Sequence, residues 1–249
     1  MLKRFYTLVI VCCLVCFAQA TDYTASGEVL RYEVVYQWGV IWKHAADAKL
    51  TIKRTSSGYN AMLTGKTRSW ADKVYSVRDT LKSAMRADKR PLRYEKLTHE
   101  DSYYARDVVN FNHSASGTTA SCARYRKDKP TASLSLTSST PAYDMLSVFY
   151  MLRDVDYDRL ARDGRLKVVI FSGKEKETLT IAYKGREQVK LRDGSARDSY
   201  HLVFSFTRDG GKQSSDGINA WMSADERHIP LLLVGKLPVG EVKVYYSSK

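Results

Sequence analysis

The feature that most constrains the fold is an alternation of apolar and polar residues with a period of two. Five apolar residues occupy alternate positions in one early segment: Leu30, Tyr32, Val34, Tyr36 and Trp38. The same alternation recurs around residues 46–52, 179–183, 200–206 and 242–246. Because successive side chains of a strand point to opposite faces, this pattern predicts half-buried β-strands along most of the chain.

Short polar turns lie between the alternating segments. Asp209-Gly210-Gly211 is typical of a turn, because glycine adopts positive φ angles at little cost. Residues 224–227 form a charged loop between two apolar segments. Such short connections favour antiparallel neighbours, since parallel strands need long crossovers. We therefore predict a mainly β chain, built as a curled antiparallel sheet or a partly closed β-barrel.

One segment departs from this alternation and has helical spacing. Asp144 suits the N-cap position, and the apolar residues that follow it share one face of a helix. They are Met145, Leu146, Phe149 and Leu152. Residues 141–153 are therefore predicted to form one short buried helix. Because the apolar face of a sheet must be covered, we expect the strands to curl around this helix.

Two further segments are less regular. Trp70, Val74 and Val77 have helical spacing, so residues 69–79 are predicted to contain a turn of helix. Residues 114–140 are rich in Ser, Thr and Ala. This second segment also includes Lys127-Asp128-Lys129-Pro130, and we expect it to form an irregular excursion from the sheet.

The first twenty residues have the features of a cleavable secretory signal peptide. Two basic residues precede an apolar run over residues 8–17, and Ala18-Gln19-Ala20 offers the small residues that a signal peptidase recognises. The run is shorter than the roughly 20 apolar residues of a membrane-spanning helix. We predict cleavage near Ala20, export to the periplasm, and one antiparallel β domain over residues 21–249 without a transmembrane segment. An uncleaved anchor and a lipid-modified cysteine are the alternatives.

Cleavage changes both the charge and the cysteine content. The net charge falls from +13 to +11 because Lys3 and Arg4 are removed, and three of the four cysteines are removed with them. Only Cys122 stays, so the mature monomer forms no internal disulfide and depends on its core for stability. A basic exported protein favours anionic lipids or glycans as partners, and nucleic acid is not expected. The basic residues are dispersed, however, and equally suit a solvated surface.

The sequence contains no recognisable catalytic or metal-binding set. Gly-x-Ser-x-Gly, a glycine-rich phosphate loop and His-Glu-x-x-His are absent from it, and its five histidines lie far apart. The charged residues 225–228 suit a solvated hairpin tip, while Asp144 and Arg153 suit the two ends of a helix. We therefore predict no catalytic residues, no metal and no cofactor.

Aromatic residues supply most of the candidate ligand contacts. The chain has 17 tyrosines, and several aromatic residues lie in or near predicted strands. Aromatic-lined cavities suit lipids, sterols and sugars, although tyrosine is also an ordinary strand residue. The candidate ligand-binding residues are Tyr32, Tyr36, Trp38, Trp42, Asp144, Tyr150, Arg153 and Trp221.

Three parts of the chain together carry a family resemblance. They are residues 27–32 with 38–41 and 46–48, residues 144–153, and residues 221–230 with 239–242. In this order and spacing they resemble the exported bacterial family catalogued as domain of unknown function 3108. The resemblance implies a periplasmic protein of Gram-negative bacteria with a curled antiparallel sheet. It also implies a likeness to periplasmic lipoprotein carriers, whose half-barrels hold acyl chains around a helical lid, and it brings no catalytic residues.

Two functional hypotheses follow. The first is a non-enzymatic periplasmic binding or carrier protein for an apolar or amphipathic molecule of the cell envelope, such as a lipid. The alternative is a cell-envelope scaffold or accessory protein that binds anionic polymers or a protein partner through its basic surface. An internal apolar cavity favours the first hypothesis, whereas a filled core favours the second.

Overall fold

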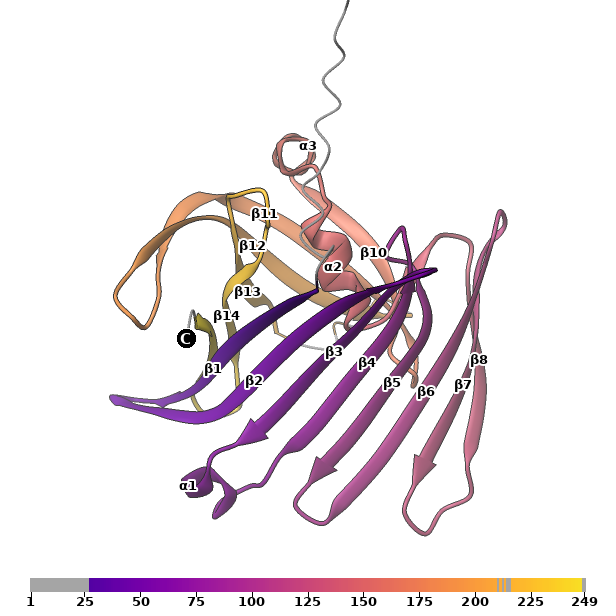
Figure 1. Ribbon diagram of the computed structural model, residues 1–249, viewed down its shortest axis with the longest axis horizontal. Helices are drawn as coiled ribbons and strands as arrows, with labels where there is room; N and C mark the ends of the chain where they lie inside the picture. Colours follow the sequence, from indigo (N-terminus) through magenta and orange to yellow (C-terminus); the bar gives the residue numbers. More distant parts are fainter. Residues whose placement is uncertain (1–26, 210, 212, 214–215, 248–249) are drawn as a thin grey trace, which may run out of the picture.

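The computed structural model describes residues 27–209, 211, 213 and 216–247 (Figure 1). The predicted signal peptide, over residues 1–20, lies outside the described residues. The first eight strands, which form one arm of the sheet, are β1 (Glu28–Trp38), β2 (Ile41–Thr55), β3 (Gly58–Thr67), β4 (Arg78–Arg86), β5 (Pro91–Glu100), β6 (Tyr103–Ser114), β7 (Gly117–Arg126) and β8 (Ala132–Ser138).

The second arm contains seven strands, and three short helices lie between strands. The strands are β9 (Ala142–Tyr143), β10 (Arg165–Phe171), β11 (Lys176–Lys190), β12 (Ala196–Arg208), β13 (Ile218–Ser223), β14 (Pro230–Lys236) and β15 (Glu241–Ser247). The helices are α1 (Ser69–Asp72), α2 (Ser147–Arg153) and α3 (Tyr157–Asp163).

All fifteen strands belong to one sheet, and the first and last of them pair at its middle. From β1 the sheet extends strand by strand to β8, and from β15 it extends back to β9. Neighbouring strands are antiparallel, except that β9 is parallel to β10. Because strands twist, a sheet this wide coils, and its two arms wrap around α2 (Figure 1). This nearly closed, barrel-like sheet confirms the predicted fold.

Helix α2 is buried because it is apolar on both sides. Tyr150, with Leu146 just before the helix, packs into the cluster formed mainly by the first arm. Val148 and Leu152 pack into the second cluster, against the inner face of the other arm. The predicted buried helix is confirmed, but it begins at Ser147 because the two residues of β9 pair with β10.

The irregular excursion expected at residues 114–140 is wrong, since this segment forms the hairpin of β7 and β8. Small side chains are needed there because they face large ones across the ladder. Ala120 stands opposite Phe111, and Cys122 stands opposite Val109. Cys122 is buried. The small inward-facing residues of β7 therefore reflect packing, while the serines at alternate positions of β7 and β8 are exposed.

Of the other two helices, one was predicted from the sequence and one was not. Helix α1 confirms the turn of helix expected after residue 69. Helix α3 was not anticipated, although its ends carry ordinary signals. The Asp156 side chain accepts a hydrogen bond from the Arg159 backbone N–H at 2.9 Å, and Gly164 ends the helix with a φ of 73°. Across the described residues, no helix has both the length and the apolar character needed to span a membrane.

Candidate functional site

The start of α2 is held by a buried carboxylate. One oxygen of Asp144 accepts the backbone N–H groups of Leu146 and Ser147, both at 2.7 Å. The other oxygen accepts the Ser83 hydroxyl of β4 at 2.6 Å. The N-cap of α2 is Leu146 and not Asp144, but Asp144 holds the turn that leads into the helix and ties it to the first arm of the sheet. Burial raises the pKa of Asp144 to about 6, although these hydrogen bonds favour the charged form.

The end of α2 is held by a second buried charged group. The Arg153 guanidinium donates to the two Glu28 carboxylate oxygens at 2.5 and 3.1 Å and to the Arg227 carbonyl at 2.8 Å. Arg227 also donates to Glu28, at 2.9 Å. Burial raises the pKa of Glu28, but the hydrogen bonds and charges of the two arginines outweigh it and hold that pKa below its ordinary value.

The loop between β13 and β14 closes over this end of the helix. His228 has a φ of 43°, and its Nδ1 lies 2.8 Å from the Arg153 carbonyl oxygen, to which it donates. Its ring lies 4.6 Å from the ring of Tyr157, which in turn stacks on Tyr200 at 4.2 Å. The charged residues at 225–228 therefore do more than form a solvated hairpin tip, because they join the end of α2 to β1, β12 and α3.

An apolar pocket of about 100 Å³ lies between α2 and the inner face of the second arm. Every residue that lines it is apolar. The helix side contributes Met145, Val148, Phe149 and Leu152, and strands β11 to β14 contribute Leu179, Phe204, Phe206, Ile218 and Leu233. The alternation of the strands explains this lining, since each strand directs alternate side chains toward α2. The arrangement suits the end of a hydrocarbon chain and offers no polar group for catalysis.

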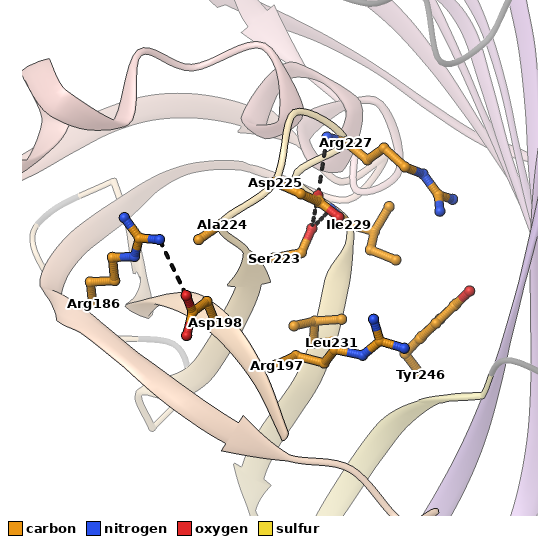
Figure 2. Close-up of a pocket in the computed structure, with 10 residues that line it drawn as sticks. All are labelled: Arg186, Arg197, Asp198, Ser223, Ala224, Asp225, Arg227, Ile229, Leu231 and Tyr246. Carbon is orange, nitrogen blue, oxygen red and sulfur yellow. Dashed lines mark hydrogen bonds and ion pairs between the residues drawn. The ribbon is translucent and has the colours of Figure 1, made fainter. Parts of the chain in front are cut away.

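A polar pocket of about 350 Å³ lies beyond the end of α2, near the loop between β13 and β14 (Figure 2). Arg186 is directed at Asp198, 3.3 Å away. Asp225 accepts the Ser223 hydroxyl at 2.6 Å and the Arg227 backbone N–H at 3.1 Å. The carboxylates of this pocket are therefore engaged by side-chain and backbone groups of the protein itself.

The structure separates the eight candidate ligand-binding residues into groups. Tyr32, Asp144, Tyr150 and Arg153 are buried around α2. Trp221 is half-buried on β13, where its ring stacks on His201 at 4.5 Å and packs against the edge of the core cluster that contains Tyr32 and Tyr150. The other three lie at or near the exposed end of the β1–β2 hairpin: Tyr36, Trp38 and Trp42. The structure thus brings the first group together, places Trp221 at the edge of the same cluster, and leaves the β1–β2 residues outside it.

The distant group has its own contacts. The Tyr36 hydroxyl donates to the Val239 carbonyl at 3.0 Å. Trp38 and Trp42 are 59% and 50% exposed, and the Lys243 ammonium lies 4.0 Å from the Trp42 ring centre. The alternation that places Leu30 and Tyr32 in the core is shifted by a register irregularity between Val34 and Val35, so that Val35 is buried in place of Val34. Beyond it, the hairpin extends past the part of the sheet that α2 covers.

Sequence reasoning missed the partners that hold α2 and the strand side of the apolar pocket. Glu28 is the first residue of β1, and only its place beside Arg153 shows its role. Phe204 and Phe206 were recognised as strand residues but not as pocket residues. The sequence does carry a signal for these two residues, because phenylalanines at alternate positions of a strand form one apolar surface. Which helix packs against that surface depends on the curl of the sheet.

Two tyrosine hydroxyls near α2 are buried without a hydrogen-bond partner among the described residues, those of Tyr32 and Tyr94. Burial raises the pKa of each above its ordinary value of 10.0. We expect Tyr32→Phe to raise the free energy of unfolding by about 1 kcal/mol, because an unpaired buried hydroxyl is costly. Tyr150→Phe is the matched control, since the Tyr150 hydroxyl donates to the Thr51 carbonyl at 3.4 Å. Urea unfolding measures both variants, and a loss of stability in Tyr32→Phe contradicts the expectation.

Comparison with known proteins agrees with this fold. Residues 31–247 match the family model described as "Protein of unknown function (DUF3108)". No curated protein matches the chain. A crystal structure of a beta-barrel-like protein of domain of unknown function DUF1849 from Brucella abortus is similar, with a TM-score of 0.60 and 12% identity over 90% of this chain and 96% of that chain. That likeness shows the fold alone. Because the family model spans most of the chain, the protein belongs to the DUF3108 family of proteins of unknown function.

Proposed function

We propose that this protein is a non-enzymatic, periplasmic binding or carrier protein for an apolar or amphipathic molecule of the cell envelope. The observation that carries the proposal is the wholly apolar pocket between α2 and strands β11 to β14. Cavities lined only by apolar side chains exclude water and take up apolar groups. Export rests on the signal-peptide pattern of residues 1–20.

The size of the pocket limits what enters it. Pockets that enclose a whole small molecule are usually about 300–1,000 Å³. This pocket has a volume of about 100 Å³, so it accepts one apolar end of a ligand while the rest lies outside. An amphipathic molecule with a hydrocarbon tail meets this requirement, because its polar part stays in contact with water.

The charged groups around α2 support a binding role over catalysis. Asp144, Glu28 and Arg153 direct their hydrogen bonds at protein atoms on neighbouring elements. A catalytic acid or base instead has to reach a substrate atom within hydrogen-bond distance. The groups therefore serve to position α2, and through it the helix side of the pocket.

The proposal predicts that filling the pocket weakens apolar binding. Ile218→Trp adds a bulky side chain to the pocket lining, and we expect it to lower the affinity for the fluorescent probe N-phenylnaphthylamine about fivefold or more. Ser205→Trp is the matched control, because Ser205 neighbours Phe204 in β12 and points to the opposite face of the sheet. Fluorescence titration gives both dissociation constants.

Two results of that titration contradict the proposal. One is an absence of probe binding to the wild-type protein. The other is an equal loss of affinity in Ile218→Trp and Ser205→Trp, which places the probe elsewhere. Thermal unfolding of each variant shows whether the sheet is intact, and Leu233→Phe provides a second, smaller filling of the same pocket.

A further inference from the structure

The outer face of the sheet carries a hollow of about 590 Å³ over strands β2 to β5. The strand register explains why it is hollow. Lys53, Asn60, Ala84 and Arg93 form one cross-strand row, in which the short Asn60 and Ala84 lie between the two long side chains. The short residues make the floor and the long ones make two walls. With strands spaced about 4.8 Å apart, the walls stand roughly 14 Å from each other.

The hollow is strongly cationic. Its lining contains three cationic residues at outward-facing strand positions: Lys53, Lys82 and Arg93. Glu95 is the carboxylate of the lining, and its side chain is only 15% exposed. It already pairs with Arg106 and lies 3.9 Å from the Lys82 ammonium. The hollow therefore presents an excess of positive charge to the solvent.

Two of the cations keep their full charge for a ligand. Arg93 donates to the Asn110 side-chain oxygen at 2.8 Å, and a neutral amide does not neutralise a guanidinium. Lys53 is exposed and forms no ion pair within the part of the chain that the structure describes. Guanidinium and ammonium groups at these positions match phosphate or carboxylate oxygens.

The sheet itself separates this hollow from the apolar pocket. On β4, Ser83 points inward to Asp144, whereas its neighbours Lys82 and Ala84 point outward. The two surfaces can therefore be altered independently by substitutions at alternate positions of the same strand.

From these observations we infer that the outer hollow is a binding site for a short polyanion, a chain-like molecule with two or more phosphate or carboxylate groups. Its volume falls in the range of small-molecule sites. A single anion contacts only one wall, whereas anions spaced along a chain reach Lys53 and Arg93 together. The site goes beyond the proposed carrier function, because it faces solvent on the opposite side of the sheet.

The test measures binding of two probes to the full mature protein by isothermal titration calorimetry at low salt. Inorganic tripolyphosphate represents phosphate chains, and oligogalacturonate represents carboxylate chains. At least one of them is expected to bind, and the affinity should fall as sodium chloride is added, because salt screens exposed charges. The Lys53→Gln/Lys82→Gln variant is expected to bind about tenfold more weakly, since each exposed contact is modest.

Lys167→Gln/Lys236→Gln is the matched control, because it removes the same charge from exposed residues outside the hollow. Its affinity should stay within about twofold of wild type. Ala84→Glu places a carboxylate on the floor and should weaken binding as strongly as the lysine variant. The inference is overturned if neither probe binds at low salt, or if the control loses as much affinity as the lysine variant. The probe that binds more tightly identifies the anion as phosphate or carboxylate.

Discussion

Arg153→Met is expected to lower the free energy of unfolding by about 3 kcal/mol. The Arg153 side chain is 1% exposed, and its removal leaves the Glu28 carboxylate, itself 9% exposed, with Arg227 as its partner. An incompletely paired buried charge is costly, because it has lost its hydration and the remaining hydrogen bonds and charges do not fully compensate for that loss. Urea unfolding at neutral pH measures the change.

A double variant separates the charge effect from packing. Glu28→Gln combined with Arg153→Met removes both charges, so we expect it to recover part of the stability that Arg153→Met loses. Arg159→Met is the control, because the Arg159–Asp163 pair is exposed and its loss should cost less than about 0.5 kcal/mol. Equal stability of Arg153→Met and Arg159→Met refutes the view that Arg153 anchors α2.

Asp144→Ala is expected to cost about 2–4 kcal/mol, more than an ordinary helix cap. The substitution leaves the Ser83 hydroxyl and the backbone N–H groups of Leu146 and Ser147 without their acceptor in a buried place. Asp144→Asn keeps an acceptor oxygen of similar shape and should cost less. If Asp144→Ala lowers the free energy of unfolding by less than about 1 kcal/mol, Asp144 stabilises the protein no more than an ordinary helix-capping residue.

The same residue predicts a pH dependence. Folding raises the pKa of Asp144 from 3.8 to about 6, so the folded state binds its proton more tightly than the unfolded state. The resulting stabilisation is fully present below pH 3.8 and is lost as the pH rises through about 6. The loss amounts to about 3 kcal/mol. Asp144→Asn does not titrate, so its stability curve should lack this decline.

Glu28 changes stability with pH in the opposite direction, so its contribution has to be separated from that of Asp144. Its folded pKa lies below the ordinary 4.5, so its contribution is present above that pH and is lost as the pH falls. The difference between the wild-type and Asp144→Asn curves isolates Asp144, because Glu28 is common to both proteins. Parallel curves between pH 4 and pH 7 contradict the raised pKa of Asp144.

The sequence was sufficient for the parts of the fold that depend on local pattern. Alternation identified β1, β2, β11, β12 and β15, and the apolar spacing of residues 145–152 identified the buried helix. It failed at residues 114–140, because Ala120 and Cys122 are small only to match Phe111 and Val109 across the ladder. Such matching depends on register, which a single strand does not reveal.

The site was predictable only in part, for a related reason. Asp144, Tyr150 and Arg153 were predicted together because they lie on, or three residues before, one short helix. Their partners Ser83, 61 residues away from Asp144, and Glu28, 125 residues away from Arg153, come from other strands. The curl of the sheet brings these partners together, and that curl is a property of all fifteen strands.

A crystal structure of the protein with a fatty acid brominated at the end of its chain tests the central proposal most directly. The bromine gives an anomalous signal that locates the apolar end without ambiguity. The proposal predicts a bromine peak between α2 and β12, beside Val148 and Phe204 in the apolar pocket. A bromine peak only on the outer face of the sheet, or no bound fatty acid at all, contradicts it.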